Sequence, residues 1–142
     1  MKYDPTWIPK SWKYCFNHEC PLHDECLRFQ SALELPANKV WGNAVFPTAL
    51  VDGECRFFRR NEKVLLATGF VLPDNPVMSA VFVKMRRKLT KYLGGNGTYY
   101  LYRNGEKWLR PKHQLGIEKI LRQGGYEGEI SYAQYREDYD FL

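Results

Sequence analysis

The sequence predicts an α+β fold in which an irregular, metal-stabilised N-terminal part packs on a helix–β-hairpin–helix–helix unit. Three observations lead to this prediction. All four cysteines lie within the first 55 residues. Apolar residues between positions 78 and 92 recur at three- and four-residue steps, which is the spacing of one helix face. An Asn104-Gly105 pair separates two short apolar segments, as in a β-hairpin.

The chain is predicted to form one domain over residues 1–142. Its length and its 44% content of hydrophobic residues are sufficient to bury a core. Within this domain, residues 1–72 form the cysteine-containing part and residues 73–142 form the helix–hairpin–helix–helix part.

The cysteine-containing part has few signals for regular structure, because prolines interrupt it at positions 5, 9, 21, 36 and 47. Asp24 is suited to cap a short helix over residues 25–33, with Cys26 in the first turn. Residues 40–46 and 63–70 are predicted to be strands, since they are rich in apolar and β-branched residues.

The second part is predicted to begin with a helix that starts after Asp74-Asn75-Pro76 and stops at Gly94-Gly95. Lys84, Arg87, Lys88 and Lys91 share one stripe of this helix, away from the apolar face. The stripe therefore predicts a basic surface on the first helix of this part.

A hairpin is expected next, with strands at residues 98–103 and 106–110, because a type I′ turn requires positive φ at both central residues and Asn-Gly tolerates it. A helix then runs from Pro111 to about Gln123 and stops at glycine. Ser131 and Gln134 form a capping box that predicts a last helix.

The cysteine cluster is the clearest indication of chemistry. Cys15, Cys20 and Cys26 are separated by four and five residues, and Cys55 follows after 28 more. Thiolates suit Zn²⁺ and iron–sulfur clusters, and four of them complete a tetrahedral site. The spacing lacks the Cys-x-x-Cys pairs of a standard zinc ribbon, and His18 and His23 are alternative ligands.

Three interpretations of the cluster stay open: structural Zn²⁺, a 4Fe–4S cluster, and free or disulfide-bonded thiols. The sequence shows neither a secretory signal nor a run of eighteen apolar residues, so we expect a cytoplasmic protein in which disulfides are rare. Four thiolates would leave no open metal position, and no set of acid, base and nucleophile is readable. We therefore predict a non-enzymatic module with structural zinc, with an iron–sulfur or thiol redox protein as the alternative.

A longer pattern includes these cysteines. It begins as Cys15-Phe-Asn-x-x-Cys20-Pro-x-x-x-x-Cys26-Leu-Arg28 and continues through Cys55-x-Phe-Phe58, Thr98-Tyr-Tyr100, Tyr102-Arg-x-Gly-Glu-Lys107, Pro111 and Tyr135-Arg-Glu-Asp-Tyr139. With these residues the chain resembles, over most of its length, a family of small uncharacterised proteins from Bacteroides-type bacteria, a domain of unknown function. The resemblance implies that the four cysteines act as one set, and it implies no activity. Arg56 stands where the family usually has proline.

The basic residues are concentrated in the middle of the chain. Residues 56–122 contain fifteen Lys or Arg against four Asp or Glu, a net charge of +11, whereas the whole chain carries +5. This charge predicts a nucleic acid or an acidic protein as partner, and hairpin aromatics would stack on unpaired bases. A solvated surface is the alternative. The predicted binding residues are Arg59, Arg60, Lys84, Arg87, Lys88, Lys91, Arg103 and Lys107.

Overall fold

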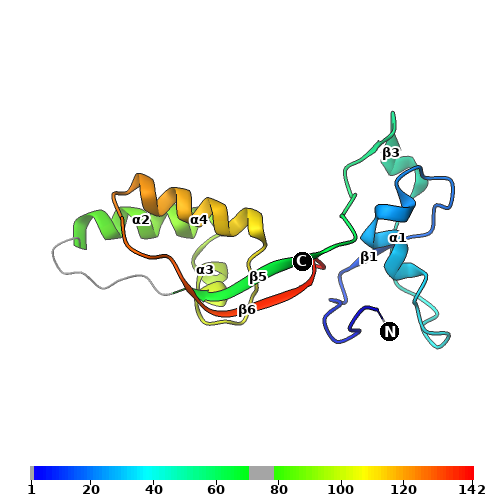
Figure 1. Cartoon of the computed structure of the whole chain (residues 1–142), viewed down its shortest axis with the longest axis horizontal. Helices are drawn as coiled ribbons and strands as arrows, with labels where there is room; N and C mark the ends of the chain where they lie inside the picture. The colour runs from blue at the N-terminus through cyan, green and yellow to red at the C-terminus, as the bar shows by residue number, and fades with distance from the viewer. Residues whose placement is uncertain (1, 71–78) are drawn as a thin grey trace. The chain divides into compact units, whose positions relative to one another are not determined.

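The computed structural model describes residues 2–70 and 79–142 and has a mixed α+β fold, which confirms the predicted class (Figure 1). Its elements in chain order are β1 (Lys13–Cys15), η1 (His23–Glu25), α1 (Leu27–Ala32), β2 (Asn43–Val45), η2 (Pro47–Ala49), β3 (Leu50–Val51), β4 (Glu54–Cys55), β5 (Lys63–Phe70), α2 (Ser79–Tyr92), α3 (Asn96–Arg103), α4 (Pro111–Gln123) and β6 (Tyr132–Tyr139). The predicted helix start at Asp74-Asn75-Pro76 lies outside the described residues.

The chain divides into two compact units. Unit 1 contains residues 1–63 and 138–142, and unit 2 contains residues 64–137. Unit 1 holds all four cysteines, and unit 2 holds helices α2, α3 and α4. The arrangement predicted from the sequence, one domain with a cysteine-containing part at residues 1–72 and a second part at residues 73–142, stays a prediction.

Unit 1 combines very short strands with an aromatic core. β1 and β2 pair in parallel, with Cys15 opposite Val45, and β3 and β4 pair antiparallel. Helix α1 packs on β1. The ring centroids of Trp12 and Phe141 lie 4.8 Å apart in an edge-on arrangement that suits aromatic pairs. The buried core residues are Tyr3, Trp12, Tyr14, Leu27, Tyr139 and Phe141.

The last residues of the chain are held in unit 1 by backbone carbonyl groups. Trp7 Nε1 donates a hydrogen bond of 2.9 Å to the carbonyl of Tyr139. Arg59 Nη1 donates to the carbonyls of Asp140 and Leu142 at 2.8 and 2.7 Å, and it lies 3.0 Å from the Asp140 carboxylate. These bonds secure the segment that brings Tyr139 and Phe141 into the core.

Helix α1 begins later than predicted. Asp24 belongs to η1 and does not cap α1, whose N-cap is Cys26, with an extended backbone at φ −97° and ψ 119°. The Cys26 carbonyl accepts the first bond of the helix, from Gln30 N–H at 2.9 Å. The predicted strand over 40–46 is shortened to β2, whereas the strand over 63–70 is confirmed as β5.

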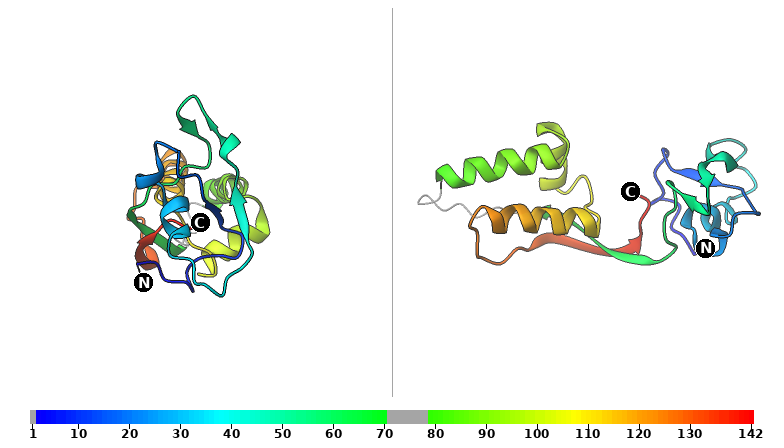
Figure 2. Two further views of the ribbon diagram at one scale, coloured as in Figure 1. Left: turned by 90° about the vertical axis from the view of Figure 1, so that its right-hand side faces the viewer. Right: turned by 90° about the horizontal axis from the view of Figure 1, so that it is seen from above.

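In unit 2, helices α2, α3 and α4 pack beside an extended β-pair. Strands β5 and β6 lie side by side and run in opposite directions (Figure 1). Helix α2 packs against both α3 and α4, and α2 and α4 lie alongside each other (Figure 2). The helix predicted from Pro111 to Gln123 is confirmed as α4. The buried core residues of unit 2 are Phe70, Met85, Leu89, Leu93, Tyr99, Tyr102, Leu109, Ile117 and Leu121.

The predicted hairpin is wrong, because residues 96–103 form helix α3. Tyr99 and Tyr102 are three residues apart and are both buried, so a helix places them on one face toward the core. Asn104 has φ −84°, and only Gly105 has positive φ, so the pair cannot form a type I′ turn. Instead, Leu109 bridges to Ala67 of β5 through two backbone hydrogen bonds of 2.6 and 3.2 Å.

The predicted last helix is also wrong, because Tyr132–Tyr139 forms strand β6. Pairing with β5 satisfies the backbone of this tyrosine-rich segment, and tyrosine favours strands. The long-range pairing therefore overrides the local capping signal of Ser131 and Gln134. The close approach of the two strands depends on Gly69, where an added side-chain carbon would stand 2.8 Å from Ala133 Cβ.

Replacing Gly69 by alanine should destabilise unit 2 for two reasons. Its φ of +74° disfavours a side chain, and the added Cβ would collide with Ala133. We expect Gly69→Ala to lower the free energy of unfolding by about 3 kcal/mol in urea titrations. Gly125→Ala is the matched control, since its φ is +92° with no atom within 4 Å, and should cost about 1 kcal/mol. Equal losses for the two variants would contradict the close approach.

Candidate metal centre

The four cysteines come from four separate segments of unit 1. Cys15 ends β1, Cys20 lies in the turns before η1, Cys26 precedes α1, and Cys55 ends β4. All four are free thiols; Cys26 is buried and the other three are half-buried. The last of these cysteines is far from the others in sequence.

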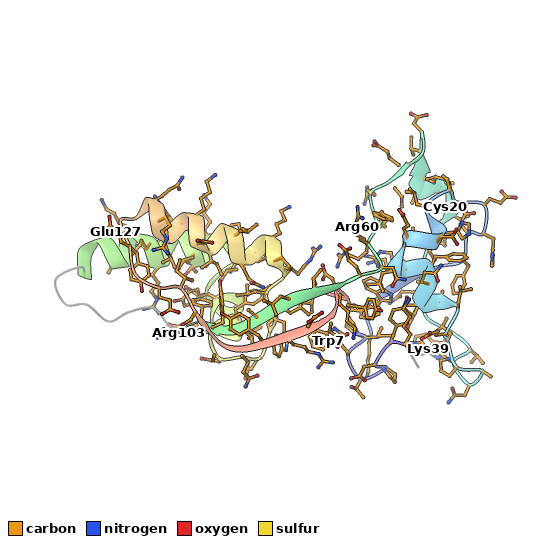
Figure 3. The ribbon with its side chains drawn as sticks, viewed as in Figure 1. Trp7, Cys20, Lys39, Arg60, Arg103 and Glu127 are labelled. Carbon is orange, nitrogen blue, oxygen red and sulfur yellow. The ribbon has the colours of Figure 1, made fainter. Side chains whose placement is uncertain are left out.

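A single small cavity is lined by all four cysteines. Its volume is about 20 Å³, enough for one water-sized group. Figure 3 shows Cys20 beside helix α1. The other residues that line the cavity are mostly apolar: Asn17, Leu22, His23, Arg28, Phe29, Val45, Phe57 and Phe58. The fold thus brings the predicted ligand set together, and its binding of a metal stays a prediction.

Successive turns bring Cys20 and Cys26 to the same cavity. Cys20 N–H donates to the Asn17 carbonyl at 3.3 Å, and His23 N–H donates to the Cys20 carbonyl at 3.2 Å. Cys26 N–H then donates to the His23 carbonyl at 3.3 Å. The chain therefore stays compact between these cysteines without a long helix or strand.

The two histidines near the cysteines have different positions. His23 lines the cavity, but its Nδ1 lies 2.6 Å from the Cys20 carbonyl and its Nε2 lies 3.1 Å from the Asp24 carboxylate. His18 is exposed, does not line the cavity, and places its ring edge-on to Phe29. Because both nitrogens of His23 already have partners, the cysteines are better placed as ligands than either histidine.

Backbone hydrogen bonds join the segment after Cys55 to residues around the start of α1. Leu27 N–H donates to the Arg59 carbonyl at 2.6 Å, and Asn61 N–H donates to the Glu25 carbonyl at 2.8 Å. These bonds surround an antiparallel bridge between Cys26 and Arg60. The segment that follows Cys55 is consequently fixed across the N-terminus of α1.

Arg28 links the segments that carry the cysteines. From α1, its Nε donates to the Phe57 carbonyl at 2.6 Å and its Nη1 donates to the Lys13 carbonyl at 3.0 Å. Its guanidinium also stacks over Trp12, 4.1 Å from the ring centroid. The linking role of Arg28 is not predicted from the sequence, where Arg28 appears only in the Cys26-Leu-Arg28 part of the family-like pattern.

The charge of Arg28 acts on the cysteines. Burial lowers the pKa of Arg28 below its usual value, and the charge of Arg59 acts in the same direction. Cys26, Cys55 and Cys15, in decreasing order, oppose this effect and raise the pKa of Arg28. The guanidinium of Arg28 therefore lies within electrostatic reach of these three cysteines.

The sulfur atoms are not arranged around a common ion. Among residues 2–70 and 79–142, no set of three or more His, Cys, Asp or Glu side chains is positioned to hold a metal ion. The structure thus places four potential ligands around one cavity without the geometry of a metal complex.

The predicted basic binding residues are divided between the units. Lys84, Arg87, Lys88 and Lys91 are all exposed on α2, and Arg103 and Lys107 are exposed in and after α3. In unit 1, Arg60 is exposed and lies 3.7 Å from the Glu62 carboxylate. Arg59 instead bonds the C-terminal carbonyls and supports the fold.

The aromatic residues that were predicted to stack on bases do not lie on a hairpin. Because α3 is a helix, Tyr99 and Tyr102 are buried in the core of unit 2, and Trp108 is half-buried. Tyr100 is exposed and its hydroxyl accepts a hydrogen bond from Arg86. Lys107 lies over the Tyr102 ring at 5.4 Å. Tyr99 and Tyr102 therefore serve mainly in packing.

These features define an α+β domain with a cysteine cluster. Residues 1–141 match the model of a family described as "Family of unknown function (DUF6078)", and the chain belongs to this family. No curated protein and no solved structure matches the chain. In the part of the chain that the structure describes, no helix has the length and apolar character needed to cross a membrane.

Replacing Arg28 by alanine should destabilise unit 1, because two carbonyl groups lose their donor and Trp12 loses its stacking partner. We expect a loss of about 2 kcal/mol in the free energy of unfolding, followed by tryptophan fluorescence in urea. The control is Arg60→Ala, which removes only an exposed ion pair and should cost about 0.5 kcal/mol or less. A loss for Arg28→Ala no greater than that of the control would refute the linking role.

Proposed function

We propose that Cys15, Cys20, Cys26 and Cys55 bind one Zn²⁺ ion as a structural centre of unit 1, in a non-enzymatic module. The observation that carries the proposal is the single cavity lined by four thiols from four segments. Zn²⁺ in structural sites is held tetrahedrally, and four cysteine thiolates are a common ligand set.

Zinc binding requires the thiols to turn toward a common centre. A change of one χ1 rotamer moves a cysteine sulfur by about 3 Å, and a zinc–sulfur bond is about 2.3 Å long. The cavity of about 20 Å³ lies between the four side chains and is large enough for one ion. We therefore expect side-chain rotation, with little change of the backbone that positions the cysteines.

The surroundings of the cavity suit a negatively charged complex. Four thiolates around a divalent ion leave a net charge of about −2. Arg28 offsets part of this charge, and the aromatic walls formed by Phe29, Phe57 and Phe58 limit the access of water. Such outer contacts stabilise a metal centre and fix its ligands.

The scarcity of regular structure in unit 1 supports a structural role. Strands β1 to β4 contain two or three residues each, and α1 contains six. A metal supplies folding free energy where the core and secondary structure are small. A closed four-thiolate site also has no position for a substrate.

A 4Fe–4S cluster or a thiol redox centre is the alternative use of the same residues. Both use cysteine thiolates, and a cubane cluster also takes four of them. The small cavity favours a single ion, because a cluster of four irons and four sulfides fills more space. The reduced state of all four cysteines is compatible with either use.

Metal analysis of the full chain tests the zinc proposal. Protein purified anaerobically should contain about one zinc per chain and no iron, and Cys26→Ser should lower the zinc content severalfold. His18→Ala is the control and should keep its zinc, because His18 is exposed and outside the cavity. Iron with visible absorbance would reject zinc in favour of the iron–sulfur alternative. Protein without any metal would overturn both metal centres and leave the thiol redox centre.

We also propose that unit 2 binds nucleic acid through the exposed face of α2, with an acidic protein as the alternative partner. The sequence of unit 2 contains twelve Lys or Arg against six Asp or Glu, a net charge of +6, whereas unit 1 has nine against ten. On α2, Lys84, Arg87, Lys88 and Lys91 are exposed, and neither α2 nor α3 contains an acidic residue. Lysine and arginine gain affinity for phosphates by releasing counterions.

Charge reversal on α2 tests this second proposal. We expect the double variant Lys84→Glu/Lys88→Glu to weaken binding to a fluorescent DNA oligonucleotide by about tenfold or more, and to reduce the salt dependence of binding. The matched control is Lys112→Glu/Lys119→Glu, which changes the net charge equally at exposed positions of α4. Equal weakening by both double variants would show attraction by net charge alone, and absence of DNA binding by the unmodified protein would reject the proposal.

A further inference from the structure

Unit 1 exposes several large apolar side chains around strand β2. Val40 and Trp41, just before this strand, are 84% and 86% exposed, and Phe46, just after it, is 74% exposed. Phe16 and Val51 are also exposed. A tryptophan left in water forgoes the favourable burial of a large aromatic surface. Such a concentration of exposed apolar surface indicates a binding surface.

Two hollows flank β2. The first has a volume of about 290 Å³ and is lined by residues that include Tyr14, Phe16 and Trp41. The second has a volume of about 440 Å³ and is lined by residues that include Phe46, Val51 and Phe57. Asn43 belongs to the first lining, and Ala44 and Val45 belong to the second, so β2 runs between the hollows.

One edge of β2 is open to a further strand. Within the described part of the chain, β2 pairs with β1 and with no other strand. An unpaired edge presents backbone donors and acceptors that an added strand can satisfy. β2 spans about 10 Å at 3.3 Å per residue, so an added segment of about five residues would reach from one hollow to the other.

The charged residues of the two hollows all have the same sign. Lys39 lines the first hollow, and Lys13 and Arg56 line the second. Neither lining contains an aspartate or a glutamate. Unit 1 as a whole has nine basic and ten acidic residues, so the positive charge is local. A small local group of positive charges favours binding of a short acidic peptide segment over binding of a long polyanion such as nucleic acid.

We infer that β2 binds an extended peptide segment of a partner protein, in which apolar side chains alternate with acidic ones. The segment adds to the open edge of β2 through main-chain hydrogen bonds. Its apolar side chains enter the two hollows, and its carboxylates face Lys39, Lys13 and Arg56. Trp41 is the main anchor, because exposed tryptophans at interfaces contribute disproportionately to affinity. Binding of a peptide at β2 requires neither zinc nor nucleic acid.

Selection from a displayed library of random peptides on the full-length protein tests the inference. We expect the selected sequences to be enriched in apolar residues alternating with Asp or Glu. Trp41→Ala and Phe46→Ala should each lower the affinity of a selected peptide by about tenfold or more, without loss of folding, since both side chains are exposed. Leu115→Ala is the control, because Leu115 is 66% exposed in unit 2 and should not affect binding.

Several outcomes would overturn the inference. Failure to select any peptide, selection of basic peptides, or equal binding by the Trp41→Ala and control proteins would each reject it. Light scattering and vesicle sedimentation identify other occupants of the same surface. A dimer that is lost in Trp41→Ala would assign the surface to a second copy of the chain, and Trp41-dependent sedimentation with lipid vesicles would assign it to a membrane.

Discussion

The side chain of Arg28 holds together the segments on which the cysteine cavity depends. It extends from α1 beside Cys26, and its two hydrogen bonds reach the carbonyls of Lys13 and Phe57, each two residues from another cysteine. Hydrogen bonds to a charged donor are stronger than neutral ones, and the stack on Trp12 fixes the plane of the guanidinium. One arginine thereby sets the spacing of three cysteine-bearing segments and brings positive charge close to them.

The two units obtain their stability in different ways. The described part of unit 2 has three helices of eight or more residues whose apolar faces converge on a common core. Unit 1 has an aromatic core, but its remaining chain is organised by turns, two short strand pairs, the isolated Cys26–Arg60 bridge and side-chain bonds to carbonyls. The cysteines lie in the unit with less regular structure. This distribution is the physical reason to expect a metal there, since an ion cross-links segments that short strands hold only weakly.

Local patterns in the sequence predicted the elements that do not depend on distant pairing. The β5 strand, the end of α2 and the whole of α4 follow from apolar periodicity, proline and glycine. The sequence also identified the four cysteines that line one cavity. It failed at α3 and β6, where tyrosines suit helix and strand alike and the outcome depends on burial of Tyr99 and on pairing with β5. Arg28 and Arg59 were not separable from other basic residues, because their role depends on carbonyls that only the folded chain brings near.

The return of residues 138–142 to unit 1 affects the order in which the chain can fold during synthesis. Unit 2 is a continuous segment, whereas the core of unit 1 lacks Tyr139 and Phe141 until the residues that follow unit 2 have been synthesised. The usual order, in which N-terminal structure forms first on the ribosome, is therefore reversed for the packing of Trp12 and Tyr3. During that interval the cysteine segments are already synthesised but lack part of the core beside them. Early binding of the proposed zinc ion would protect these thiols while the remainder of the chain is translated.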